Sequence, residues 1–189
     1  MMTMMPQPIP LRFKVDDYYR MIEFGMLDDY EKAEIIEGEL IRQMLVGDRH
    51  AACVERLNEF LRDELGKSVS IRNQQPIKVG DYNEPQPDLA IVKRRDDFYG
   101  NSKPTGDNCL LLIEVSDSTL DYDRNKKLPL YAEGNIPEFW LVNLQNNTIE
   151  VHTEPRESVY SLIRVLRRGE TIKSESVPNL QIKVDAILG

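Results

Sequence analysis

Apolar residues recur at helical spacing most clearly in one segment of the chain. Residues 49–65 place apolar side chains three or four positions apart, the spacing of a single helix face: Val54, Leu57, Leu61 and Leu65. Asp48 stands where a residue that caps the first turn is expected, and Gly66 stands where the chain would leave the helix. We therefore predict a helix over residues 49–65.

Short apolar runs predict strands elsewhere in the chain. Residues 87–92 and 109–115 are almost entirely apolar, which is typical of strands covered by helices on both faces. A loosely alternating run at 33–46 predicts a hairpin with its turn at Glu37-Gly38. Further strands are predicted at 68–72, 75–79, 138–144, 148–153 and 159–166, followed by edge strands and a short terminal helix.

Two more helices complete the expected fold. Residues 16–32 predict a short surface helix, and residues 121–134 predict one that kinks or begins late, because Pro129 lacks a backbone donor. The order of elements predicts an α/β fold with a central mixed sheet flanked by helices, with parallel pairing of the strands that the second helix joins. We expect one domain, 16–189, behind a flexible N-terminal arm, 1–15.

Composition narrows the class of protein. The 189 residues are 41% hydrophobic and 30% charged, enough apolar material for a core. The net charge of −8 argues against a protein that coats nucleic acid, and residues 16–39 alone carry −7 of it. Two cysteines and two histidines at wide spacing exclude a zinc-binding pattern. With no long apolar run and no signal-peptide pattern, we expect a cytoplasmic protein without membrane contact.

Two acidic residues stand next to strands where a carboxylate is costly to bury. Asp88 opens the strand at 87–92, and Glu114 lies near the end of the strand at 109–115. Two such carboxylates at one sheet end would suit Mg²⁺ or Mn²⁺, and Lys127 on the next helix could orient a water. The alternative is purely structural: Asp88 caps a turn, Glu114 pairs with an arginine, and the lysine is solvated.

The motifs QPDLAIV (86–92), LLIEVSDST (111–119) and DRNKKLPLYAEGNIPEFWLVNL (123–144) resemble the putative restriction endonuclease family of the PD-(D/E)XK nuclease superfamily. YEKAEIIEGELI (30–41) and GDRHAACVERL (47–57) extend the resemblance over most of the chain. It implies a restriction-endonuclease-like core and a Mg²⁺-dependent DNA endonuclease. Asp88, Glu114 and the Val115 carbonyl would bind the metal. Ser116 occupies the position of the superfamily's usual lysine, so Lys127 would take that role.

Other residues are secondary candidates for the same site. The resemblance implies that His50 lines the cleft and that one acid of the 33–46 hairpin, Glu37 rather than Glu34 or Glu39, approaches the metal through a water. Ser116 would hydrogen-bond the site, or else cap the next helix. Lys93, Arg94 and Arg95 would contact nucleic-acid phosphates, although such a triplet is more often a solvated loop end.

Two alternatives belong to other classes of function. A cysteine nucleophile is disfavoured, because Cys53 has His50 one turn away but no third group to orient it. The stronger alternative is a catalytically inactive nuclease-like scaffold that binds nucleic acid or protein. A DNA endonuclease that cuts both strands is well served by two-fold symmetry, so a homodimer is also expected.

Overall fold

The fold is organised around a six-stranded mixed sheet in the order β3-β4-β5-β6-β7-β8. This computed structural model describes residues 9–28, 33–42 and 46–189. The strands are β3 (Val69–Asn73), β4 (Leu89–Lys93), β5 (Cys109–Ser116), β6 (Glu138–Asn143), β7 (Thr148–Arg156) and β8 (Val159–Arg167). Only β5 and β6 pair in parallel; the other neighbours are antiparallel. The predicted α/β fold with a mixed sheet is therefore confirmed.

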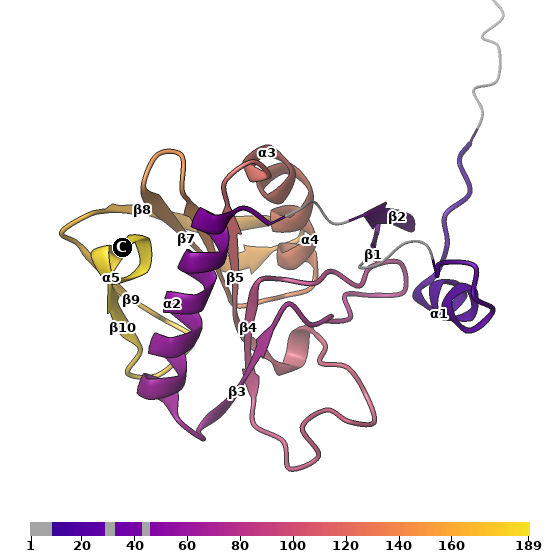
Figure 1. Cartoon of the computed structure of the whole chain (residues 1–189), viewed down its shortest axis with the longest axis horizontal. Coiled ribbons are helices and arrows are strands. Elements are labelled where there is room, and N and C mark those ends of the chain that lie inside the picture. Colours follow the sequence, from indigo (N-terminus) through magenta and orange to yellow (C-terminus); the bar gives the residue numbers. More distant parts are fainter. Residues whose placement is uncertain (1–8, 29–32, 43–45) are drawn as a thin grey trace, which may run out of the picture.

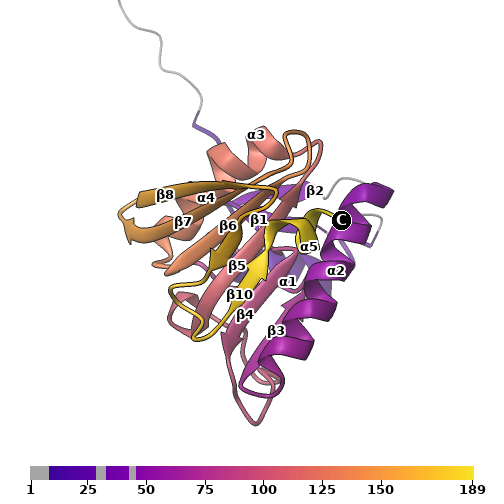
Figure 2. The ribbon, with the colours of Figure 1, turned by 90° about the vertical axis from the view of Figure 1, so that its left-hand side faces the viewer.

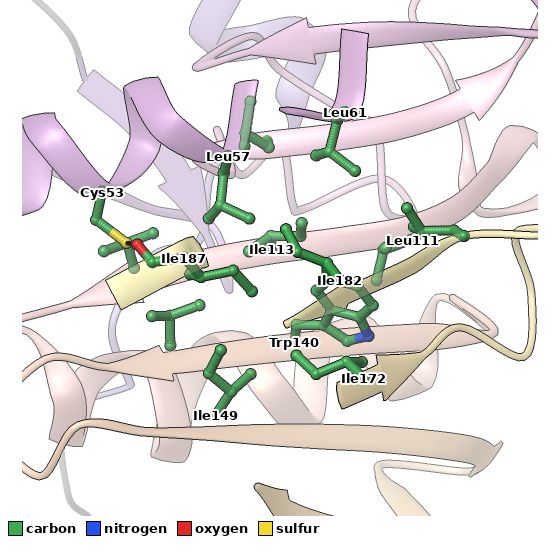
Figure 3. Packing of buried hydrophobic residues seen from close by; sticks show 14 of the residues in the cluster. Cys53, Leu57, Leu61, Leu111, Ile113, Trp140, Ile149, Ile172, Ile182 and Ile187 are labelled. Carbon is green, nitrogen blue, oxygen red and sulfur yellow. Dashed lines mark hydrogen bonds between the residues drawn. The ribbon is translucent and has the colours of Figure 1, made fainter. Parts of the chain in front are cut away.

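One face of the sheet is covered by helix α2 (Asp48–Leu65), helix α5 (Val184–Leu188) and the strand pair β9 (Thr171–Lys173) and β10 (Gln181–Lys183). Figure 3 shows the interior of this layer, where Leu57 and Leu61 of α2 point toward Ile113 and Leu111 of β5. The predicted apolar face of α2 is the face that packs on the sheet. Its cap is Gly47 rather than Asp48, which instead forms the first helical residue.

The opposite face carries the crossover between the parallel strands β5 and β6. It consists of three consecutive helical segments, α3 (Leu120–Tyr122), the π-helical turn η2 (Asp123–Lys127) and α4 (Leu128–Glu133). Figure 2 shows these segments and α2 on different sides of the strands. The parallel pairing predicted for this connection is confirmed. A short 3₁₀ turn, η1 (Gly106–Asn108), directly precedes β5.

The N-terminal elements are helix α1 (Val15–Glu23) and the hairpin β1 (Ala33–Ile36) and β2 (Glu39–Arg42). The hairpin is confirmed, and a bridge between Ile35 and Glu84 joins it to the body of the protein. Helix α1 ends earlier than predicted because the chain turns at Gly25, whose φ is +68°. The predictions for residues 1–8, 29–32 and 43–45, including much of the expected arm, lie outside the described residues.

The strand predicted at 75–79 is wrong. Pro76 removes one donor, and the remaining amides bond to loops, with Ile77 N donating to Pro85 O and Lys78 N to Pro104 O. Apolar residues here fill the core without forming a strand of the sheet. Among the described residues, no helix combines the length and the apolar character needed to cross a bilayer.

Candidate active site

The antiparallel register of β4 and β5 brings the two predicted acids together. Leu89 lies opposite Ile113, so Asp88, just before β4, is placed beside Glu114 near the end of β5. The Val115 amide donates to Asp88 Oδ2 at 2.9 Å, and the Asp88 amide lies 3.4 Å from Glu114 Oε2. Asp88 is 7% exposed and Glu114 only 3%, so both carboxylates are buried.

Lys127 reaches the same acids from the crossover helix. Its Nζ lies 3.1 Å from Glu114 Oε1 and 3.5 Å from Glu34 Oε1, and the residue is 7% exposed. Pro129 does not interrupt the helix: the preceding turn widens to a π-helix, in which the Leu128 amide donates to Asp123 O. Because the proline falls in the first turn of α4, its missing donor is tolerated there.

Two further residues of this helical face complete the cluster, and the sequence predictions missed both. Tyr131, four positions after Lys127, donates its hydroxyl to Glu114 Oε1 at 2.6 Å. Asp123, four positions before Lys127, accepts hydrogen bonds from Ser116 Oγ at 2.7 Å and from Thr119 Oγ1 at 2.6 Å. The spacing 123, 127, 131 was the available signal, since residues four apart share one helix face.

Asp88 is held by two more side chains. His50 Nε2, from the first turn of α2, lies 2.9 Å from Asp88 Oδ2, which places the predicted histidine in the cleft. Gln74, which no sequence pattern indicated, donates its amide nitrogen to Asp88 Oδ1 at 3.3 Å and its backbone amide to Asp88 O at 3.0 Å. Gln74 adopts a φ of +47°, a strained conformation for a side chain of this size.

These groups line one cavity of about 580 Å³ between the β1–β2 hairpin, the start of α2 and the crossover helix. Figure 1 shows the first turn of α2 at the same upper end of the molecule as α3. The cavity is lined by all three residues of the predicted catalytic set, by His50 and by the hairpin acid Glu34. Several carboxylates and one lysine in the lining of one cavity favour a cationic ligand.

Negative charge is in excess in this cluster. Glu34, Asp88, Glu114 and Asp123 are all buried, whereas Lys127 is the buried cation among them. Burial, with the charges of Asp123 and Asp88, raises the pKa of Glu114 to about 8 despite the opposing effect of Lys127. Burial acts to lower the pKa of Lys127, but the carboxylates of Glu114 and Glu34 outweigh it and raise that pKa.

The donor set fits a hard divalent cation. A metal site built from side chains alone needs at least three acid, histidine or cysteine side chains close together. No such group is present within residues 9–28, 33–42 and 46–189. Mg²⁺ is commonly held by one or two carboxylates together with waters and substrate oxygens, so Asp88 and Glu114 supply what such an ion needs. A cation there would also offset the excess negative charge of the four buried acids.

Other predicted site residues lie away from the cavity. Glu37 is exposed at the hairpin turn, where its carboxylate pairs with Lys126 at 2.7 Å, so Glu34 is the hairpin acid at the site. Packing of the hairpin explains the difference, since all four residues of β1 are buried, Glu34 among them, whereas Glu37 lies in the exposed turn.

The basic triplet also lies away from the cavity. Lys93 is the last residue of β4, roughly 17 Å along the strand from Asp88, and Arg94 and Arg95 follow it. There Lys93 Nζ donates to Asp107 O, Arg94 stacks over the Phe98 ring, and Arg95 pairs with Asp97. None of the three lines the cavity, which therefore lacks the phosphate contacts that the triplet was expected to supply.

Cys53 has no nucleophilic environment. It is fully buried, its Sγ contacts Ile187 O at 3.4 Å, and burial raises the pKa of its thiol to about 11. Burial likewise raises the pKa of the Cys109 thiol to about 12. We expect neither thiol to react with a disulfide reagent at pH 8 until urea unfolds the chain, when both titrate. Rapid reaction of one thiol in the native protein would contradict this burial.

Comparison with known proteins agrees with this architecture. A crystal structure of a putative nuclease from Anabaena variabilis, belonging to DUF820, has the same fold with a TM-score of 0.65. The two chains are 15% identical, and the match covers 82% of this chain and 89% of that one. No curated protein matches the sequence. The model of the family described as putative restriction endonuclease matches residues 15–185, nearly the whole chain, and the chain therefore belongs to that family.

Proposed function

We propose that the protein is a Mg²⁺- or Mn²⁺-dependent endonuclease that hydrolyses phosphodiester bonds in DNA. The observation that carries the proposal is the convergence of Asp88, Glu114 and Lys127, from three separate elements, at the floor of one cavity. Membership in the putative restriction endonuclease family supports the same class of reaction. Buried acids that repel one another cluster at functional sites, which favours an active enzyme over an inactive scaffold.

Each residue has a distinct role in this proposal. Asp88 and Glu114, with the Val115 carbonyl, would hold the divalent ion, which supplies Lewis-acid polarisation of the phosphate and a more acidic water. Lys127, already in contact with Glu114, would orient the attacking water or stabilise the charge that develops on phosphate oxygens. His50 and Gln74 fix the Asp88 carboxylate, and Tyr131 fixes that of Glu114.

Isothermal titration with Mn²⁺ and Mg²⁺ tests the first step. The wild-type protein is expected to bind one ion per chain, and Asp88→Asn is expected to weaken binding at least about tenfold because it removes a ligand charge. Arg94→Ala, at the far end of β4, is the matched control and should bind the ion as wild type does. Ion binding that survives both Asp88→Asn and Glu114→Gln would refute the assigned site and favour an inactive scaffold.

A further inference from the structure

The cavity wall above the acids is apolar and aromatic. Ile41 of β2, Val46 before α2, and Tyr122 of α3 line the same cavity as Asp88 and Glu114. The Tyr122 hydroxyl is buried, and no hydrogen-bond partner for it is present in the described part of the chain. An aromatic ring in a cavity wall suits a ligand that has a planar face, as a nucleobase does.

Few cations surround this cavity. Among the described residues that line it, Arg42 at the end of β2 is the one basic side chain besides His50 and Lys127, which the acids already engage. No carboxylate pairs with Arg42 among the residues that the structure describes. Duplex binding rests on several phosphate contacts along a basic surface, and one arginine cannot provide them. A single phosphate contact is what one strand passing the cavity requires.

Charge near the cavity acts in the same direction. Among the described residues that line the cavity, carboxylates outnumber cationic side chains: Glu34, Asp88, Glu114, Asp117 and Asp123 stand against Arg42, Lys127 and His50. A duplex presents one negative charge per roughly 1.7 Å of its axis, about twice the linear density of one of its strands. This excess of carboxylates therefore disfavours a duplex more strongly than a single strand at the same distance.

We infer that the substrate of this site is unpaired nucleic acid, a single strand or a flap, with one base held against Tyr122 and its phosphate near Arg42. The inference rests on the proposed nuclease function and specifies its substrate class. A cavity of about 580 Å³ lies within the range of clefts that hold one ligand of nucleotide size. Base stacking on an aromatic side chain is tolerant of sequence, so cleavage has little sequence preference.

Cleavage assays with Mn²⁺ on three matched DNA substrates test the inference. A 30-nucleotide single strand and a flap of that sequence are expected to be cut at least about tenfold faster than the blunt duplex. A duplex cut as fast as the single strand overturns the inference and leaves the nuclease function intact. If none of the three substrates is cut with Mn²⁺ or with Mg²⁺, the proposed function fails. Binding measurements then test the cavity separately.

Fluorescence anisotropy with a labelled single strand in Ca²⁺ supplies that readout. Tyr122→Ala is expected to weaken binding by about 5- to 100-fold, and Tyr122→Phe by less than about tenfold because the ring remains. Arg42→Ala should weaken binding and reduce its salt dependence, whereas Arg94→Ala, its matched control, should do neither. Unchanged affinity in both Tyr122→Ala and Arg42→Ala, with circular dichroism showing a native fold, overturns the assignment of the cavity.

Discussion

Replacing Lys127 with methionine is expected to lower the rate of metal-dependent cleavage by about 10²- to 10³-fold. The Nζ of Lys127 lies 3.1 Å from Glu114 and 3.5 Å from Glu34, in the interior of the cavity. A fixed, buried cation stabilises developing negative charge far more than an exposed one, and methionine keeps the length of the side chain without the charge. Single-turnover cleavage with saturating Mn²⁺ measures the loss in the chemical step.

The neighbouring lysine provides the control for this prediction. Lys126 has the same side chain on the same turn, but it is exposed and pairs with Glu37 at the surface. Lys126→Met is expected to retain the wild-type cleavage rate and to change the free energy of unfolding by less than about 0.5 kcal/mol. Lys127→Met leaves Glu34 and Glu114 without their buried partner, so a lower melting temperature is expected as well. Loss of cleavage in Lys126→Met together with a wild-type cleavage rate in Lys127→Met would contradict the assignment of Lys127 to the active site.

The choice of Lys127 illustrates how far sequence reasoning reaches in this fold. Asp88 and Glu114 stood out because acids beside apolar strands are rare, and the antiparallel register of β4 and β5 then brought them together. Lys127 was chosen because it lies on the helix after the Glu114 strand and because the family resemblance places the lysine there, although the widened turn before Pro129 could not be predicted from the sequence. Local apolar patterns therefore predicted most of the elements, whereas the acidic pair was predicted from acids beside apolar strands and from the family resemblance.

Contacts made through turns and loops could not be predicted from the sequence. Gln74 contacts Asp88 from a backbone conformation with a positive φ, and no residue pattern predicts that conformation. The hairpin acid depended on how β1 packs, because this packing buries Glu34 with the rest of the strand and leaves Glu37 exposed in the turn. Arg94 was predicted to contact substrate phosphates because it follows the strand that Asp88 begins. That strand is extended, so Arg94 lies at its opposite end from Asp88.

Glu114→Gln is expected to have the largest effect on activity, with cleavage reduced at least about 10³-fold. The change removes one ligand charge for the divalent ion, whose stabilisation of the transition state amounts to several kcal/mol. Glutamine retains the shape of the side chain and can still accept the Tyr131 hydroxyl. Glu133→Gln, on the exposed end of α4, is the matched control and should cleave at the wild-type rate.

The same variant is expected to alter the dependence of stability on pH. Burial raises the pKa of Glu114 from its usual 4.5 to about 8, so the folded chain keeps a proton that the unfolded chain releases between these values. Wild-type stability in EDTA should therefore fall as the pH rises through this window, whereas Glu114→Gln, which cannot titrate, should show a flatter curve. Melting temperatures from pH 5 to 9 measure the difference.

Adding the divalent ion separates the catalytic role of Glu114 from a structural one. A cation binds the ionised carboxylate, so Mn²⁺ should raise the melting temperature of the wild-type protein more at pH 8 than at pH 6. Glu114→Gln should respond little at either pH, and Glu133→Gln should behave as wild type. Equal stabilisation of wild type and Glu114→Gln by Mn²⁺ would mean that the ion binds elsewhere. Glu114 would then be a buried acid that serves only to hold Lys127 and Tyr131 in place.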